Sequence, residues 1–146
     1  MGYRIERLAP RWVDRMVEIE ESSFSRPWRR EHFLHELENP FSHPIGILSG
    51  DLLVGFLILS VVHDEGEVLD LAVAPPFRGR GYGRALMEEG IGLCRNMGVR
   101  ALHLEVRETA VEARSLYRHL GFSETGRRRG YYEQGIDAVL MTLSLA

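Results

Sequence analysis

The sequence contains no lysine, and all eighteen of its basic residues are arginine. A chain without lysine has no side chain that can form a Schiff base with a carbonyl substrate. It also lacks the Gly-Lys-Ser/Thr step with which a P-loop holds the phosphates of ATP. Both classes of chemistry are therefore excluded.

Cysteine is almost as scarce, since Cys94 is the single one. One cysteine excludes an internal disulfide and a cysteine-rich zinc site, which is typical of proteins from a reducing compartment. The six histidines are scattered without the spacing of a zinc site, so we expect no metal. We therefore expect a cytoplasmic protein without a metal cofactor.

Long apolar runs and an excess of positive charge are also missing. No apolar run approaches the roughly 20 residues of a membrane-spanning helix, and charges occupy the first six residues, where a signal peptide would be apolar. The net charge of −3 argues against direct binding of nucleic acid. With 146 residues and 45% hydrophobic content, the chain fits one globular domain over residues 1–146.

The spacing of apolar residues predicts elements in the order β-α-α-β-β-β-α-β-α-β-β, which is an α+β (α/β) arrangement. Glycine and proline punctuate these elements and favour short connections. Strands are expected at 4–8, 44–48, 52–62, 67–73, 101–106, 122–132 and 138–145, and helices at 13–19, 33–37, 83–97 and 112–120.

A loop rich in glycine and arginine joins the predicted strand 67–73 to the helix that follows. Glycines let successive backbone N–H groups approach a ligand closely, and the helix N-terminus adds partial positive charge. Arginine side chains supply donors suited to phosphate. This composition predicts an anion site built from Arg78, Gly79, Arg80, Gly81, Tyr82, Gly83 and Arg84.

A dinucleotide-binding fold is the main rival explanation for this loop. Glu105 ends the next predicted strand roughly where a ribose-binding acid belongs. However, Arg84 stands where the third glycine of the dinucleotide motif is required, and the chain offers one clear βαβ unit where such a fold needs several. The loop therefore favours a different phosphate-bearing ligand.

The string Arg78-x-x-Gly81-x-Gly83, with Leu69-Asp70-Leu71-Ala72-Val73 before it, resembles the acetyl-CoA motif of the GNAT superfamily of N-acetyltransferases. The segments 102–107 and 113–122 follow at the expected spacing. Together with 26–28 and 130–132, they resemble the subfamily that acetylates ribosomal-protein alanine. The resemblance covers essentially the whole chain, and it implies a mixed, mostly antiparallel sheet of about seven strands flanked by about four helices.

The resemblance implies acetyl-CoA as co-substrate. The backbone of Leu71, Ala72 and Val73 would bind its pantetheine arm, and the loop 78–84 would bind its pyrophosphate. One position departs from the family pattern, because Ala110 stands where an asparagine usually contacts CoA. This change removes one side-chain contact and leaves the backbone cradle in place.

The resemblance also implies that Glu105 is the base that deprotonates the acceptor amine and that Tyr117 protonates the departing thiolate. Strand alternation places His103 and Glu105 on one face, and we expect His103 to pack or hydrogen-bond. The residues alone leave other interpretations open. Glu105 suits a strand-end carboxylate paired with Arg107 or Arg100, and Tyr117 suits a core aromatic.

We assign the acceptor side to Trp28, Asp70, Tyr131 and Tyr132, because the three aromatic rings among them suit the wall of a peptide groove, although they also suit ordinary hairpin and helix packing. The family resemblance bears on the acceptor itself. It implies that the acceptor is a protein N-terminus, above all the alanine of ribosomal protein S18, and that the enzyme is a monomer or weak homodimer. Two alternatives stay open. One is acetylation of lysine, polyamines or another small amine, and the other is a CoA-sensing module without turnover.

Overall fold

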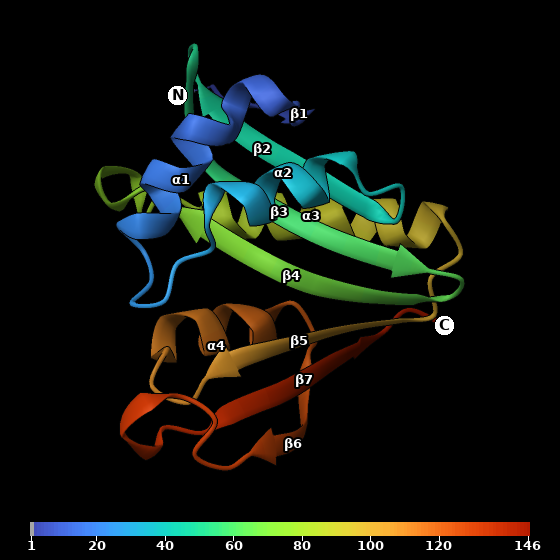
Figure 1. Cartoon of the computed structure of the whole chain (residues 1–146). Coiled ribbons are helices and arrows are strands. Elements are labelled where there is room, and N and C mark those ends of the chain that lie inside the picture. Colours follow the sequence, from blue (N-terminus) through green and yellow to red (C-terminus); the bar gives the residue numbers. More distant parts are fainter. Residues whose placement is uncertain (1) are drawn as a thin grey trace.

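The computed structural model describes residues 2–146 and places seven strands in one sheet, in the order β1-β2-β3-β4-β5-β7-β6 (Figure 1). The strands are β1 (Arg4–Arg7), β2 (Ser42–Ser49), β3 (Leu52–Val62), β4 (Glu65–Val73), β5 (Ala101–Arg107), β6 (Ser123–Arg128) and β7 (Ala138–Ser144).

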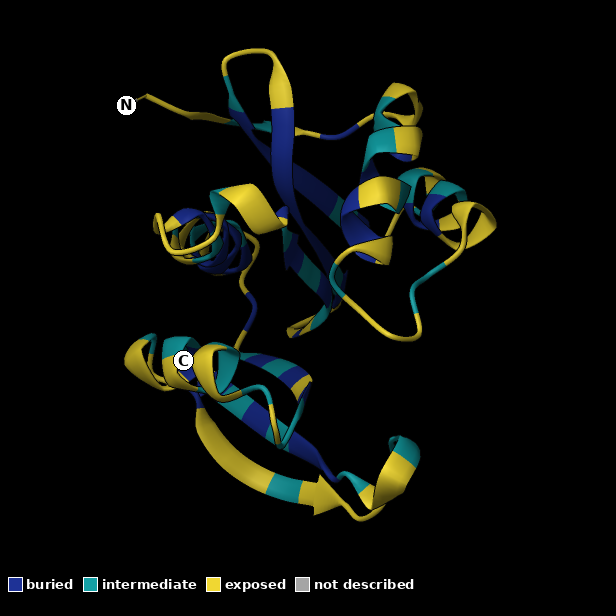
Figure 2. Cartoon of the chain, turned by 90° about the vertical axis from the view of Figure 1, so that its left-hand side faces the viewer, coloured by how far each residue is buried: buried dark blue, intermediate teal, exposed yellow. Residues whose placement is uncertain are grey.

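Four α-helices cover the two faces of this sheet. They are α1 (Val13–Glu21), α2 (Arg30–Glu38), α3 (Tyr82–Asn96) and α4 (Val111–His119). One core cluster joins α3 and α4 to the sheet, and a second cluster joins α1 and α2 to it. Figure 2 shows these two groups of helices on either side of the buried strands.

Nearly all neighbouring strands run antiparallel, and β4 with β5 is the one parallel pair within residues 2–146. That pair is hydrogen-bonded over Glu65–Glu67 and its partners 101–103, after which the two strands diverge. The gap is visible between β4 and β5 in Figure 1. The sheet therefore opens towards the C-terminal ends of two adjacent strands.

A β-bulge interrupts β4 just before this open region. Ile58 of β3 pairs with Asp70, while the next residue, Leu59, pairs with Val68, so Leu69 is an extra residue on β4. A bulge sends two consecutive side chains to the same face of a sheet. Leu69 packs with the α1/α2 cluster, and Asp70 meets Glu20 of α1 on that same face.

The packing of α3 on the sheet depends on a glycine. A Cβ atom at Gly90 would lie 2.7 Å from Leu57 and 3.0 Å from Leu59, so the helix could not approach β3 this closely with a larger residue. Cys94 follows one turn later and is fully buried, as its place on the apolar helix face predicted. This contact fixes α3, and with it the loop at its N-terminus.

The predicted element order is confirmed, and most boundaries agree within two residues. The prediction was wrong for the strand 122–132, because β6 ends at Arg128. Tyr131 and Tyr132 lie instead in a connection that contains the 3-10 turn Glu133–Gly135. Positive φ angles at Gly130, Gln134 and Gly135 explain why the strand cannot continue.

Candidate active site

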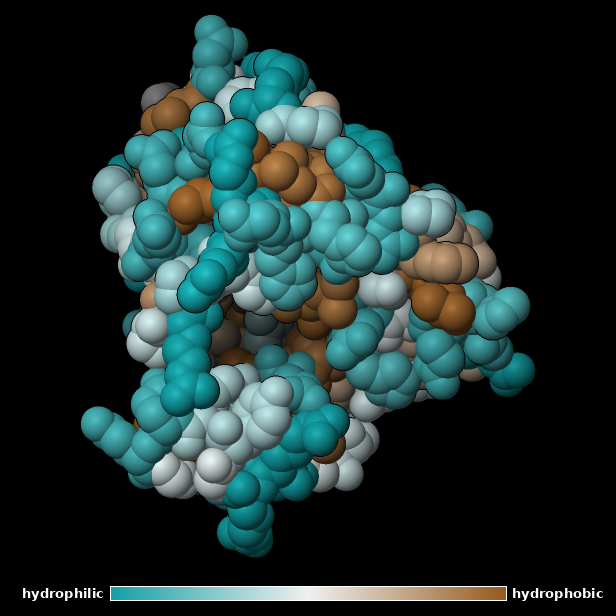
Figure 3. Space-filling view, viewed as in Figure 1, coloured by the Kyte–Doolittle hydropathy of each residue, from teal (hydrophilic) through white to brown (hydrophobic). Residues whose placement is uncertain are grey.

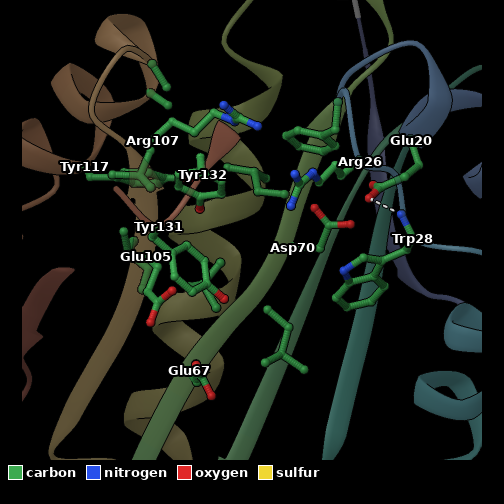
Figure 4. Close-up of a pocket in the computed structure, with 18 residues that line it drawn as sticks. Glu20, Arg26, Trp28, Glu67, Asp70, Glu105, Arg107, Tyr117, Tyr131 and Tyr132 are labelled. Atoms are coloured by element: carbon green, nitrogen blue, oxygen red, sulfur yellow. Dashed lines mark hydrogen bonds between the residues drawn. The ribbon is translucent and has the colours of Figure 1, made fainter. Parts of the chain in front are cut away.

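A pocket of about 830 Å³ fills the gap between β4 and β5. Figure 3 shows a hollow at the same place, between the two parts of the molecule. The side chains around it come from both strands, from α1 and α4, and from two loops (Figure 4). The predicted residues that it brings together are Trp28, Asp70, Leu71, Glu105, Tyr117, Tyr131 and Tyr132.

The exposed edge of β4 is the first feature of this pocket. Beyond Glu67 the strand has left β5, and no other strand of residues 2–146 takes up that edge. The segment 68–73 therefore presents backbone N–H and C=O groups that an extended ligand can pair with as a strand would. Leu71 and Ala72 keep their pairing to β3 on the other side.

The glycine-arginine loop lies at the end of β4 and leads directly into α3. Gly79 and Gly81 have φ angles of 77° and 84°, a region that only glycine adopts without strain. Gly81 is the N-cap of α3, so the amides of the first helical turn, which begins at Tyr82, point out of the helix end. The loop has the geometry of an anion site at a helix N-terminus.

The loop arginines have different surroundings in the structure. Arg78 donates to the Val73 carbonyl at 2.8 Å and to the Ser23 hydroxyl at 2.9 Å, which ties the loop to the end of α1. Arg80 lies over the Phe77 ring, and Arg84 pairs with Glu88 on the next turn of α3. Arg80 and Arg84 are exposed and able to reach a bound anion.

Tyr117 reaches the pocket from α4, on the face that carries α3. Its side chain is 7% exposed and packs against Phe122. Burial, with a smaller effect from the charge of Asp70, raises the pKa of Tyr117 above its ordinary value. The phenol therefore keeps its proton at neutral pH and is available as a proton donor.

Glu105 lies on β5 at the opposite face of the sheet, because Leu102, Leu104 and Val106 are the buried residues of this strand. Its carboxylate accepts a hydrogen bond from Arg128 at 2.8 Å, so the predicted partners Arg107 and Arg100 are not the ones it has. His103 lies on the same face and hydrogen-bonds Thr142 and Glu65, which confirms its expected role.

Three aromatic residues form the rim of the pocket. The Trp28 ring stacks on His32 at 3.8 Å, and its backbone N–H donates to Glu20 at 3.0 Å. Tyr131 and Tyr132 meet edge to face at 5.1 Å, with Arg107 over the Tyr132 ring. Rings from segments about 100 residues apart thus face the same opening (Figure 4).

Two buried carboxyl groups line the pocket on this face. Glu20 is 2% exposed and Asp70 is 9% exposed, and each has one oxygen without a hydrogen-bond donor among residues 2–146. Their carboxyl groups point towards each other in Figure 4. Burial, followed by the hydrogen bond to and repulsion from Glu20, raises the pKa of Asp70 well above its ordinary value.

A polar clasp, consisting of Ser25, Arg26, Arg107 and Glu133, joins the two sides of the opening. Glu133 accepts from Arg107 at 2.5 Å and from Ser25 at 3.1 Å, and it pairs with Arg26 at 3.5 Å. A hydrogen bond from its own backbone, and then the bond from Arg107, lower the pKa of Glu133 to about 2. The clasp thus remains charged at neutral pH.

Ala110, at the position of the usual asparagine, is the N-cap of α4 and lines the pocket. Its methyl group cannot accept a hydrogen bond from the first turn of the helix. Within residues 2–146 no three His, Cys, Asp or Glu side chains form a group that could hold a metal ion. No helix of that range is long and apolar enough to cross a membrane.

Sequence reasoning missed Glu20 and Arg107 as pocket residues, and it missed Glu133, which pairs with Arg107 at the opening. Each acquires its partner through tertiary contacts over tens of residues, which the sequence around it does not indicate. The one available signal was for Glu20, which falls on the apolar face of α1 beside Met16 and Ile19. A charged residue on a buried helix face calls for a partner.

The family model described as the acetyltransferase (GNAT) family matches residues 13–122, which is most of the chain. The chain belongs to this family. It is 36% identical, over 132 residues, to the [ribosomal protein bS18]-alanine N-acetyltransferase of Salmonella typhimurium, and the match covers 88% of each chain. The family resemblance in the motifs is thereby confirmed.

Solved structures agree with this assignment. The ribosomal-protein-S18-alanine N-acetyltransferase of Escherichia coli superimposes with a TM-score of 0.94 at 31% identity, covering 99% of this chain and 95% of that one. An N-acetyltransferase of Thermoplasma acidophilum, solved in complex with coenzyme A, has a TM-score of 0.84 at 18% identity and covers 99% of each chain. The second likeness establishes a shared fold.

Proposed function

We propose that the protein transfers the acetyl group of acetyl-CoA to the α-amine of a protein N-terminus, with the N-terminal alanine of ribosomal protein bS18 as acceptor. One observation carries this proposal: a phenol on one face, a carboxylate on the other and an unpaired strand edge converge on a single pocket. Membership of the acetyltransferase family and the names of the relatives supply the acceptor.

The donor enters on the α3/α4 face. The amides of the loop 79–84 and of the first turn of α3 bind the pyrophosphate, with Arg80 and Arg84 adding charge. Arg78 anchors the loop through Val73 and Ser23. The pantetheine arm pairs with the edge formed by Leu71, Ala72 and Val73, and a backbone N–H near Val73 polarises the thioester carbonyl.

The acceptor amine must lose a proton before it attacks the thioester. At pH 7 an α-amine needs roughly 1 kcal/mol to reach its neutral form, whereas a lysine side chain needs about 5 kcal/mol. Glu105 accepts this proton directly or through a water molecule. Tyr117 then donates its proton to the thiolate of CoA as the tetrahedral intermediate collapses. Because the amine attacks the thioester directly, no covalent enzyme intermediate forms.

Trp28, Asp70, Tyr131 and Tyr132 form the acceptor groove, and the polar clasp holds its two walls together. We also propose a cytoplasmic enzyme that works as a monomer or weak homodimer without direct contact to nucleic acid. The arginine run 127–129 fits this view. Arg127 pairs with Glu124 and Glu108, Arg128 with Glu105, and Arg129 lies near Asp137, so each charge has an acidic neighbour.

The test is an acetylation assay with three acceptors: a peptide copying the N-terminus of the organism's own bS18, an N-terminally blocked lysine peptide, and spermidine. CoA release is followed over time, and the acetylated product is confirmed by mass. Wild type is compared with Glu105→Gln and with a matched control, Glu108→Gln, whose carboxylate pairs with Arg127 outside the pocket.

We expect rapid acetylation of the bS18 peptide by wild type and by the control, with a loss of about 10²- to 10³-fold in kcat for Glu105→Gln. Preferred acetylation of lysine or spermidine would replace the proposed acceptor. Binding of acetyl-CoA without turnover on any acceptor would contradict the enzymatic proposal and favour a CoA-sensing module.

A further inference from the structure

The buried pair formed by Glu20 and Asp70 has no role in the chemistry described so far. A buried carboxylate without a hydrogen-bond donor is strongly destabilising, because its charge has lost its water. Here two such groups lie together, and one oxygen of each lacks a donor among residues 2–146. Both groups line the pocket, and such an arrangement calls for a compensating proton or ligand.

Two carboxyl groups this close and this buried do not both ionise, because the repulsion between their charges is not screened by water. A single proton between Asp70 and Glu20 removes the repulsion and gives one of the unpaired oxygens a donor. The raised pKa of Asp70 agrees with Asp70 as the residue that holds this proton. The pair then carries one negative charge.

The carboxyl group of Glu20, which carries this charge, is held in position by its neighbours. The backbone N–H of Trp28 donates to Glu20 at 3.0 Å, and the Trp28 ring is itself stacked on His32. The nearby Arg26 pairs with Glu133 in the polar clasp. Within residues 2–146, no basic side chain forms an ion pair with either carboxyl group of this pair, which lines the pocket.

The position of the pair indicates which ligand would complete it. Asp70 lies on the open part of β4, on the face that carries Glu105, and both residues line the same pocket as Tyr117. The reacting nitrogen must lie between the groups that take and give protons. A ligand that only donates hydrogen bonds and carries positive charge fits this place, and a primary ammonium has both properties.

We propose that Glu20 and Asp70 share one proton and that the single negative charge of this pair binds the α-ammonium group of the acceptor. This inference rests on the proposed function and adds the amine-binding residues to it. The pair positions the ammonium beside the thioester, and Glu105 then takes one of its protons. Glu20 and Asp70 are positioning residues, since they neither bond to carbon nor keep the transferred proton.

Shared protonation makes an unusual prediction for amide substitutions. Asp70→Asn replaces the neutral partner by an amide that still donates to Glu20, so the charge stays on Glu20. Glu20→Gln removes the repulsion and supplies an amide donor, so Asp70 ionises and the charge moves there. Only the double variant Glu20→Gln/Asp70→Asn is neutral, and its two amides keep the size and hydrogen bonding of the original pair.

The experiment compares two peptides that differ in one group. The first begins with alanine, and the second carries a propionyl group in its place and therefore lacks the α-amine. Their dissociation constants are measured calorimetrically in the presence of CoA, for wild type, both single variants and the double variant. Acetylation of the alanine peptide by wild type, CoA affinity and melting temperature are recorded alongside.

We expect wild type to bind the alanine peptide at least about tenfold more tightly than the propionyl peptide. Both single variants should keep a clear preference, and the double variant should bind the two peptides within about twofold of each other. CoA affinity should not change. Only the loss of the pair's negative charge would produce this pattern, since the double variant retains the packing and the hydrogen bonds.

Three results would overturn the inference. A double variant that still prefers the alanine peptide would mean that the pair does not bind the amine. Single variants that each lose the whole preference would mean that binding needs both carboxyl groups, which contradicts one shared charge that either residue can carry. A wild type that neither binds nor acetylates the alanine peptide would overturn the proposed function and this inference with it, which separates that failure from the other two.

Discussion

The two faces of the opened sheet offer candidate binding sites of different construction. On the α3/α4 face, the candidate donor site consists mainly of backbone groups: a free strand edge, a loop with two positive φ angles, and a helix N-terminus. On the α1/α2 face, the candidate acceptor site consists of side chains such as Glu20, Asp70 and Glu105. A backbone site tolerates many side chains, whereas a side-chain site is altered by single substitutions.

Tyr117 lines the pocket from α4, and the proposed mechanism makes it the acid that protonates the leaving thiolate, so its loss should have the largest effect. We expect Tyr117→Phe to lower kcat about 10²- to 10³-fold while leaving both KM values within threefold. Steady-state kinetics with the bS18 peptide measures this. Tyr3→Phe, which removes an exposed hydroxyl outside the pocket, is the control. Equal rates for wild type and Tyr117→Phe would exclude the phenol as acid.

Gly81→Ala tests the donor face by itself. A Cβ atom at a φ of 84° strains the backbone by about 1 kcal/mol or more and moves the amides of the loop. We expect the KM for acetyl-CoA to rise about five- to tenfold and the acceptor KM to stay the same. Gly92→Ala, in an open position within α3, should leave both constants unchanged. A rise in the acceptor KM instead would contradict the assignment of donor and acceptor to different faces of the sheet.

Glu133→Gln tests the acceptor face through the polar clasp. Without the charge of Glu133, the hydrogen bond from Arg107 and the ion pair with Arg26 weaken, and the two walls of the groove are no longer held together. We expect the acceptor KM to rise about three- to tenfold at pH 7, with the acetyl-CoA KM unchanged. Glu124→Gln, which affects a surface pair with Arg127, is the control. An unchanged acceptor KM would show that the clasp does not shape the groove.

The clasp also has a pH signature. The pKa of Glu133 is lowered to about 2, so its ionised form stabilises the fold above the ordinary glutamate pKa near 4.5. This contribution is lost as the pH falls from 4.5 towards 2. The difference in melting temperature between wild type and Glu133→Gln should therefore be constant near pH 6 and shrink over that range. A difference that persists to pH 2 would contradict the ion pair.

Ala110→Asn should have the smallest effect, and it should be a gain. An asparagine at the N-cap of α4 can accept from the first helical turn, which stabilises a helix by about 0.5–1 kcal/mol. In the proposed mode it also restores one side-chain contact to CoA, so acetyl-CoA should bind about two- to threefold more tightly. Calorimetry and thermal melting measure both. Weaker acetyl-CoA binding would mean that the pocket needs a small residue at this position.

The difference between a backbone site and a side-chain site also explains which features could be predicted from the sequence. Glycine at 79 and 81 and the strand alternation around Glu105 are local signals, because backbone geometry and strand period are properties of neighbouring residues. They correctly placed the loop before α3 and put Glu105 on one face with His103. The loop of the candidate donor site, and the face on which Glu105 lies, could therefore be predicted from local sequence.

The acceptor side could not be predicted in the same way. The pairing of Glu20 with Asp70 spans 50 positions and that of Ser25 with Glu133 spans 108, and neither leaves a periodic pattern. The divergence of β4 from β5 depends on how both halves of the sheet pack. The sequence did predict Asp70 and the aromatic residues, but it did not predict Glu20, whose carboxyl group faces Asp70.

The bulge at Leu69 has a consequence for how such a protein can change over time. The extra residue lets position 70 face α1 while positions 71 to 73 keep their register with β3. A substitution at Asp70 therefore changes the side chain that faces α1 without shifting the strand edge beside it. In this fold, new acceptor preferences can arise by single mutations while the ancestral handling of the acetyl donor is inherited intact.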